Sequence, residues 1–484
     1  MNAIDRQTLQ RIVDRARSLG AEYADVRLLQ TQEETLTVKN GAVVGIVKTE
    51  NEGFGVRVLK NGAWGFSCSP ELSQWEKVAA EAVRVAEASA RSPRDGGVKF
   101  PPRPAIDAVY QTPFTTDPFS ISLEQKLEVM LKADAQMREV PEVKIAMTLL
   151  GFFKQTKYFA NSEGSFLRQD LMESGGGIEC TTVGEGEVQK RSYPNSFGRN
   201  QLTGGWELIT AMDLPGNARR IADEAAALLT AQQCPSEITS LILDPTQLAL
   251  QIHESCGHAV ELDRVYGMEA SFAGSSFLTT DKVGTFRYGS DIVNLYQDGT
   301  ILNGLGTYGF DDDGVPTCRT DLVKSGIFQG YLSNRETAAD LGAASTGANR
   351  ATTWHDIPIV RMTNVNLAPG TWNFDDLIAD TADGIYMITN KSWSIDDKRV
   401  NFQFGTELAY EIKKGKVGRM LKNPTYTGIT YEFWRNCDAI CNEKFWRILG
   451  TPNCGKGQPM QTARVGHCCS PTRFRNVRVG VTSC

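Results

Sequence analysis

Histidine is scarce in this chain: among 484 residues there are four, His253, His258, His355 and His467. Long apolar runs are also missing, since the stretch 145–153 is far shorter than the roughly 20 residues that a membrane-spanning helix needs. Charge of one sign is not concentrated either, because 51 basic and 57 acidic residues give a formal net charge of -6 without a long run of one sign. We therefore expect neither a membrane nor a nucleic acid as the main partner.

The amino terminus lacks the apolar segment and small-residue cleavage site of a signal peptide, which predicts a cytoplasmic protein. The chain has 11 cysteines, and without a secretion signal these are expected to be reduced thiols or metal ligands instead of disulfides. With 41% hydrophobic and 22% charged residues, the composition predicts a globular protein with a sizeable core.

The first part of the chain alternates helical and strand patterns. Apolar residues at helical spacing predict a helix over about 1–20, and short β-rich runs with Asn-Gly turns predict an antiparallel meander over 24–67. Ser69 and Pro70 then predict a helix to about residue 91, with Ser69 as its cap. A Pro- and Gly-rich stretch at 92–104 indicates a linker.

These patterns predict three domains and an α+β fold. We expect an α+β domain over 1–95, a second α+β domain over 96–235 with a similar helix, strand and helix order, and a large third domain over 236–484. The third domain is mostly antiparallel and β-rich, with helices near 245–266, 334–341 and 374–380.

The run HESCGHAVELD, residues 253–263, is the most informative motif. It lies on the predicted helix that starts at Asp244 and Pro245, so both histidines belong to one helix. Zinc peptidases with the H-E-x-x-H pattern space their histidines by four, whereas His253 and His258 are five apart. Five positions of a regular α-helix rotate the second histidine by about 140° from the first. We therefore predict a π-bulge within 254–258, for which Gly257 is a suitable place.

A metal site is favoured over two buried histidines that are close by chance. Two of the four histidines flank Glu254 in an otherwise apolar helix. A carboxylate and two imidazoles are costly to bury together without a cation. A catalytic zinc usually has three protein ligands. The residues alone leave the third open among Cys256, Glu261, Asp263, His355 and the C-terminal cysteines.

These candidate ligands are not equally favoured. Cys256 lies between the two histidines and is expected to be a small buried hydrophobe. Glu261 and Asp263 are candidates to orient the histidines, with an ordinary solvated or capping role as the alternative. His355 either faces substrate or is structural, and we favour the structural role.

Six cysteines are concentrated near the carboxyl terminus: Cys437, Cys441, Cys454, Cys468, Cys469 and Cys484. Four of them would suffice for a structural zinc cage, but their irregular spacing favours core or surface thiols. Cys454 differs because Gly455 and Gly457 permit a tight loop that presents a thiolate.

The motif set resembles the TldD/PmbA family of metallopeptidases, on the catalytic TldD side. The run 253–263 is similar to the family signature H-E-x-x-G-H-x-x-E-x-D, and stretches at 310–332, 345–352, 358–367, 454–459 and 473–480 agree with the family pattern. EYADVRL, NGAVVGI and EGFGVRVLKNGAWGF resemble its N-terminal domain. The resemblance extends over nearly the whole chain.

This resemblance implies a zinc-dependent metallopeptidase. The ligands of Zn²⁺ would be His253, His258 and Cys454, and Glu254 would be the general base on a zinc-bound water. Family members resemble one another in forming two-fold dimers and in enclosing the site in a cavity that admits unfolded peptides. The expected partners are therefore an unstructured peptide substrate and either a second copy or a PmbA/TldE-like paralogue. The thiol-rich segment His467-Cys468-Cys469 departs from the family pattern, which leaves a competing metal site or sensitivity to oxidation open.

Two other functions remain open at this stage. One is a zinc amidase that acts on a non-peptide substrate, and the other is a non-catalytic scaffold subunit stabilised by its metal. Glu254 favours catalysis, because a structural metal site has no use for a general base and is usually closed by four protein ligands.

Overall fold

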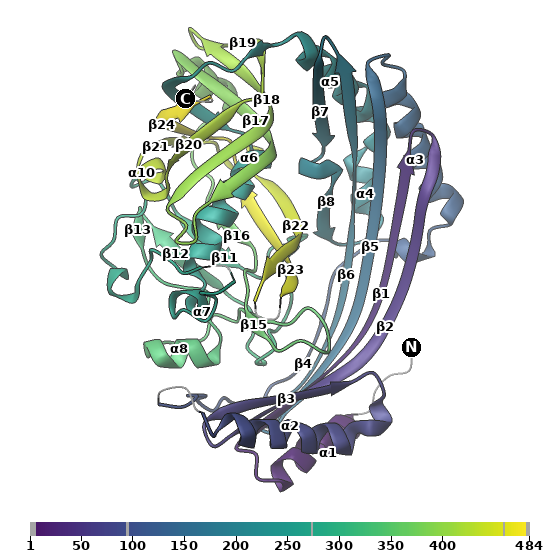
Figure 1. Ribbon diagram of the computed structural model, residues 1–484, viewed down its shortest axis with the longest axis vertical. Helices are drawn as coiled ribbons and strands as arrows, with labels where there is room; N and C mark the ends of the chain where they lie inside the picture. The colour runs from purple at the N-terminus through teal and green to yellow at the C-terminus, as the bar shows by residue number, and fades with distance from the viewer. Residues whose placement is uncertain (1–5, 93–95, 273, 458–459, 481–484) are drawn as a thin grey trace.

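The computed structural model describes residues 6–92, 96–272, 274–457 and 460–480. The chain folds into two parts that lie against each other (Figure 1): a long curved sheet with helices on its outer side, and a β-rich C-terminal part. The N-terminal elements are α1 (Arg6–Ser18), β1 (Tyr23–Lys39), β2 (Ala42–Lys60), β3 (Ala63–Ser69), α2 (Trp75–Ser89), β4 (Asp107–Gln111), α3 (Leu123–Arg138), β5 (Val143–Asn161), β6 (Phe166–Gly184), β7 (Glu187–Tyr193), β8 (Asn200–Thr203), α4 (Glu207–Met212) and α5 (Leu214–Thr230).

Within the described residues, the N-terminal strands form one eight-stranded sheet in the order β3-β2-β1-β5-β6-β4, with β7 and β8 also paired to β6. Strand β1 pairs with β2 on one side and with β5 on the other, both antiparallel. The sheet therefore crosses the expected boundary near residue 95, because β1 and β5 lie on opposite sides of it. The three-domain division stays a prediction.

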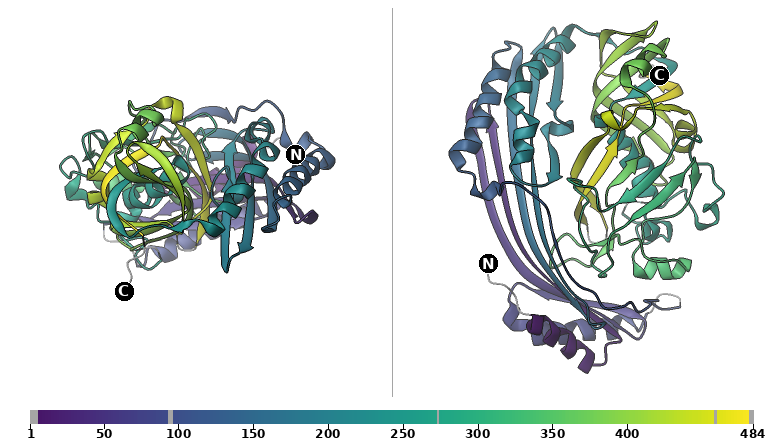
Figure 2. Two further views of the ribbon diagram at one scale, coloured as in Figure 1. Left: turned by 90° about the horizontal axis from the view of Figure 1, so that it is seen from above. Right: turned by 180° about the vertical axis from the view of Figure 1, so that it is seen from behind.

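Side chains along β1 point alternately to the two faces of the sheet, and each face contacts a different part of the protein. Val26 and Leu28 pack with α1 and α2, and Leu36 and Val38, on the same face, pack with α3 and α5. Asp25 and Arg27 point from the opposite face. The helices thus cover the convex side of the sheet, and the C-terminal part lies on the concave side (Figure 2).

The first helix and the meander agree with the sequence prediction, but the start of the second helix was predicted wrongly. Helix α2 begins at Trp75, after a short 3₁₀ turn at Leu72–Gln74. The Ser69 hydroxyl does accept a hydrogen bond, from the N–H of Glu71, at 3.0 Å. This bond stabilises the turn that leaves β3, so Ser69 is not the cap of the helix.

The C-terminal part is a mostly antiparallel assembly of short elements. They are β9 (Gln232–Gln233), β10 (Glu237–Leu243), α6 (Pro245–Ile252), α7 (Leu262–Val265), β11 (Leu295–Asp298), β12 (Arg319–Lys324), β13 (Ile327–Phe328), α8 (Arg335–Leu341), β14 (Asn349–Arg350), β15 (Ile359–Val360), β16 (Val365–Leu367), α9 (Phe374–Ala379), β17 (Asp383–Ile395), β18 (Asn401–Lys413), β19 (Lys416–Lys422), β20 (Thr425–Ile429), α10 (Thr430–Arg435), β21 (Cys437–Ile440), β22 (Arg447–Lys456), β23 (Gln461–Cys469) and β24 (Thr472–Val479). The largest sheet has the order β17-β10-β24-β20-β18-β19-β9, and β17 also pairs with β18, which closes five strands into a ring. Helix α6 packs on β17 and on the separate hairpin of β22 and β23.

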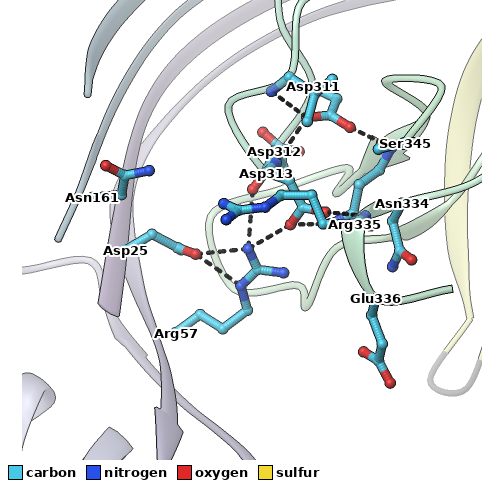
Figure 3. A network of polar contacts seen from close by, with 12 residues as sticks. Asp25, Arg57, Asn161, Asp311, Asp312, Asp313, Asn334, Arg335, Glu336 and Ser345 are labelled. Carbon is cyan, nitrogen blue, oxygen red and sulfur yellow. Dashed lines mark hydrogen bonds and ion pairs between the residues drawn. The ribbon is translucent and has the colours of Figure 1, made fainter. Parts of the chain in front are cut away.

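Buried ion pairs join the two parts (Figure 3). The guanidinium of Arg57, on β2, donates to Asp25 on β1 and to Asp313 in the C-terminal part, each at 2.7 Å. Asp312 accepts from Lys157 on β5 at 2.7 Å. Because these charges are almost fully buried, they fix the sheet against the C-terminal part only while each keeps its partner.

The structure confirms the α+β class, with helices and antiparallel sheet first and a mostly antiparallel β-rich part after them. In the part of the chain that the structure describes, no helix is both long enough and apolar enough to cross a membrane.

Candidate metal centre

Helix α6 changes to a different helical form where the two histidines occur. It begins with Asp244 as cap, whose side chain accepts from the N–H of Thr246, and with Pro245 at the first position. Residues His253–Gly257 then form a π-turn, in which the N–H of His258 donates to the carbonyl of His253. This confirms the predicted π-bulge. The i to i+5 bond restores the alignment that a spacing of five would otherwise lose.

Gly257 lies in this turn for a reason of space. Its φ of −50° is an ordinary helical value, so the turn does not use the conformational freedom of glycine. A Cβ at this position would lie 2.2 Å from Sδ of Met362, which is fully buried. The close approach of Met362, more than backbone strain, therefore excludes a larger residue.

Three side chains meet here, two from one helical segment and the third from a position 196 residues after His258. One ligand atom each from His253, His258 and Cys454 lie within 4.8 Å of one another, and all three residues are buried. Sγ of Cys454 lies 3.5 Å from Nε2 of His258. Among the residues described, this is the single place where three His, Cys, Asp or Glu side chains are grouped in a way that suits a metal ion.

Strand β22 brings Cys454 to the histidines. The pairing of β22 with β23 shifts register between Thr451 and Cys454, so the strand is irregular just before the cysteine. Two residues later, Lys456 donates to both carboxylate oxygens of Asp263, at 2.7 and 2.9 Å, and to the carbonyl of Val360. Lys456 therefore ties the strand that carries Cys454 to the segment that follows His258.

The acidic residues after the second histidine have separate contacts. Oε2 of Glu261 lies 2.8 Å from Nδ1 of His258, where a carboxylate accepts the ring N–H. Asp263 instead pairs with Lys456. Glu261 therefore orients His258, which is one of the two roles that the sequence left open for it, whereas Asp263, the other candidate, is held by Lys456. The bond to Glu261 leaves Nε2 of His258 without a proton and directed toward Cys454.

The electrostatics of the three residues suit ligands of a cation. Burial lowers the pKa of His253, and it lowers that of His258 well below its ordinary value, so both rings are neutral. Burial raises the pKa of the Cys454 thiol, but the charge of the Arg361 guanidinium and the hydrogen bond with His258 oppose burial, and the pKa lies below its usual range. Neutral imidazoles and a thiolate are the forms in which these residues bind metals.

Glu254 faces a cavity beside the three residues. One oxygen of its carboxylate accepts from Nη1 of Arg399 at 2.6 Å. Both residues line a cavity of about 410 Å³, together with His253, His258 and Cys454. The cavity wall also includes Asn195–Phe197 of the N-terminal part, so the site lies between the two parts of the protein.

The other candidate ligands lie elsewhere. Cys256 is fully buried in the apolar core, as expected, and burial raises the pKa of its thiol to about 12. His355 is exposed and packs edge-on against Trp354. Four of the C-terminal cysteines are free and buried: Cys437, Cys441, Cys468 and Cys469. Cys484 lies outside the described residues.

Sequence reasoning missed Arg399, which bonds Glu254, and it gave no role to His467. His467 is buried, and its Nε2 lies 2.7 Å from Nδ1 of His253. Its position, 214 residues from His253, gave no indication of this contact. Two signals were available: histidine is scarce, and three of the four now lie together; and the segment 467–469 departs from the family pattern.

These features define a class of candidate metal site. It combines a helix that carries an irregular H-E-x-x-x-H motif, a distant cysteine and an acidic side chain that faces a cavity. Family comparison then identifies the family. The family model described as "PmbA/TldA metallopeptidase domain 1" matches residues 24–86. The models of the central domain and of the C-terminal domain of that family match residues 116–233 and 236–480. The chain belongs to the PmbA/TldD metallopeptidase family.

Individual relatives agree with this assignment. A metalloprotease of Methanocaldococcus jannaschii is 30% identical, over 92% of this chain and 95% of its own length. A "Metalloprotease TldD homolog" of Haemophilus influenzae is 27% identical, over 94% of this chain and 92% of its own. The solved structure of TldE from Thermococcus kodakarensis superimposes with a TM-score of 0.77 at 16% identity, over 98% of this chain and all (100%) of that one. At that identity, the last comparison shows a shared fold.

Proposed function

We propose that the protein is a zinc metallopeptidase that hydrolyses unfolded or short peptides, with Glu254 as its general base. The observation that carries this proposal is the grouping of His253, His258 and Cys454 around one point beside Glu254. Two imidazole nitrogens and one thiolate sulfur are a donor set that suits zinc. Three protein ligands leave a position open, as in catalytic sites, whereas structural sites are usually closed by four.

The chain's own residues have distinct roles in this proposal. Zinc, when bound, supplies a Lewis acid that polarises a peptide carbonyl and activates water. Glu254 takes the proton of the attacking water on a carboxylate oxygen and passes it to the leaving amine. Arg399 holds Glu254 at the cavity wall through its 2.6 Å hydrogen bond.

The cavity favours a peptide over a folded protein. Its volume of about 410 Å³ falls in the roughly 300–1,000 Å³ range of pockets that enclose small ligands. Phe197 and Trp393 also line it, and they are half exposed, with ring centroids 6.1 Å apart. These rings offer an apolar contact to substrate side chains. An extended segment of an unfolded chain fits such a site.

The test combines metal analysis with peptide cleavage for the wild type, Glu254→Gln and Cys454→Ala. Glu254→Gln should keep zinc and lose cleavage, because it removes the base and leaves the ligands in place. Cys454→Ala should lose most of both. A mixture of unstructured peptides is the substrate, and a folded protein of similar composition is the control.

The alternatives give different results in the same assay. An amidase would leave peptides of every sequence intact and hydrolyse small amides. If the protein is a scaffold, the wild type and both variants would show no hydrolysis, and the one effect of Cys454→Ala would be a lower stability. Normal cleavage by Glu254→Gln would contradict the proposed mechanism. We further propose a cytoplasmic protein that forms a dimer with itself or with a TldE-like paralogue, which co-purification and mass measurement of the complex would test.

A further inference from the structure

His467 has both ring nitrogens engaged in the interior of the protein. It lies on β23 and is fully buried. Its Nδ1 lies 2.9 Å from the carbonyl oxygen of Val365, and its Nε2 lies 2.7 Å from Nδ1 of His253. The two imidazole planes meet at 81°, with centroids 4.9 Å apart. Both polar atoms of this buried ring are therefore satisfied, and one of the two partners is a candidate metal ligand.

These contacts determine which atoms carry protons. A carbonyl oxygen only accepts, so Nδ1 of His467 carries a hydrogen and donates it to Val365. The charged form of His467 would be costly to bury next to another imidazole, so its Nε2 is unprotonated and accepts. The hydrogen between the two rings therefore belongs to Nδ1 of His253. As a neutral imidazole, His253 then has a free lone pair on Nε2.

The two candidate metal ligands are oriented by different partners. His258 donates from Nδ1 to the carboxylate of Glu261, and His253 donates from Nδ1 to the neutral ring of His467. Both ligands thereby present Nε2. Metal-binding histidines usually donate their other N–H to a carboxylate, a backbone carbonyl or water, so a neutral imidazole in that place is an unusual choice. It fixes the ring without adding a negative charge.

The backbone around His467 holds it rigidly. On one side β23 pairs with β22, where His467 is opposite Leu449. On the other side the N–H of Cys468 donates to the side chain of Asn366, at 2.9 Å. Because β22 also carries Cys454, a single hairpin supplies one ligand and orients another.

We propose that His467 is a positioning residue of the metal centre, which holds His253 in the tautomer and orientation that direct its Nε2 to the metal. The proposal rests on the metal site of the proposed function. Because both ring nitrogens of His467 are engaged by His253 and Val365, it would act through His253 and not as a ligand itself.

A matched pair of variants tests this role. His467→Gln keeps an oxygen acceptor near the position of Nε2, and His467→Leu keeps the bulk without an acceptor. The first readout is the affinity for Zn²⁺, measured by competition with a chelator on protein without a histidine tag. We expect His467→Leu to weaken zinc binding by roughly 10- to 100-fold, the range for groups that orient metal ligands, and His467→Gln to restore most of it. His355→Leu, at the exposed histidine, should bind like the wild type.

The second readout is proton NMR of the Co²⁺-loaded protein, in which the ring N–H groups of metal-bound histidines give shifted signals that disappear in D₂O. The wild type should show two such signals, from His253 and His258. His467→Leu should lose or broaden one of them by faster exchange, and His467→Gln should keep both. A purely structural role of His467 would leave these signals unchanged.

The outcomes separate this inference from the function on which it rests. If the wild type binds zinc and His467→Leu equals it in affinity and in both signals, the inference is wrong and the proposed function stands. If the wild type binds no zinc, both are wrong. Labelling the four histidines with ¹⁵N requires no variant and applies even if both variants fail to fold. A proton on Nε2 of His467 instead of Nδ1 would overturn the proposal.

Discussion

Replacing Gly257 with alanine tests whether the space around the π-turn controls metal binding. The new Cβ would lie 2.2 Å from Sδ of Met362, and 3.3 and 3.4 Å from its Cε and Cγ. Met362 is fully buried, so it cannot move into solvent, and overpacking of this kind costs about 1–3 kcal/mol. Because the φ of Gly257 is helical, alanine is intrinsically favoured over glycine there, and this preference offsets up to about 1 kcal/mol of the overpacking cost. We expect the apoprotein to lose up to about 2 kcal/mol of unfolding free energy.

The metal site should be affected more than the fold. Since His258 follows Gly257 directly, relief of the overlap moves the backbone that positions Nε2 of His258 near Cys454. Metal sites tolerate ligand shifts of only about 0.2 Å. We therefore expect zinc affinity to fall on the order of 10- to 100-fold. Chelator competition measures this affinity, and urea unfolding of the apoprotein measures the stability.

A second substitution provides the control. Met362→Ala removes the atoms that the new Cβ would meet, although alone it costs about 2–5 kcal/mol by leaving a cavity. Combined with Gly257→Ala, it should restore zinc affinity, and the two changes should be less destabilising together than the sum of the single variants. Wild-type zinc affinity in Gly257→Ala, or a double variant no better than Gly257→Ala, would refute the steric reasoning.

Two further substitutions test contacts outside the ligand set. Arg399→Met should keep zinc and lower kcat on peptides by about 100-fold, because Glu254 loses the donor that holds it in place; unchanged kcat in a zinc-loaded sample would contradict this role. Asp312→Asn should lower the free energy of unfolding by about 3–5 kcal/mol, since it removes the buried partner of Lys157. Asp383→Asn, in an exposed pair, should change the stability little, and equal losses of the two variants in urea unfolding would show that burial of Asp312 does not matter.

Asp312 also makes the free energy of unfolding depend on pH. Burial raises the pKa of its carboxyl, but Lys157 and Arg27 outweigh burial and hold the pKa below its ordinary value. Its contribution to stability is therefore present at neutral pH, above the ordinary carboxyl pKa of about 3.9, and is lost as the pH falls through the lower folded value.

Local features of the chain were sufficient for much of the site. The five-residue spacing of His253 and His258, on a helix that begins at Asp244, already required an extra residue in one turn, because helical geometry is a local property. The structure confirms the π-turn. Alternation and Asn-Gly turns likewise predicted the antiparallel meander. The start of α2 was missed because Ser69 bonds within a turn before the helix, and both arrangements use the same residue types.

The sequence by itself determined which residues were chemically able to form a site: scarce histidines, an acid next to one of them, and a cysteine between glycines. The family resemblance implied that Cys454 joins the two histidines, but only the tertiary structure shows how these residues come together. Cys454 comes beside His258 through the pairing of β22 with β23, and His467 comes beside His253 on the same hairpin. No local pattern encodes such contacts, because they depend on how strands 200 residues from the helix pack against it. The role of Gly257 was decided in the same way, by the position of Met362 more than 100 residues away in the chain.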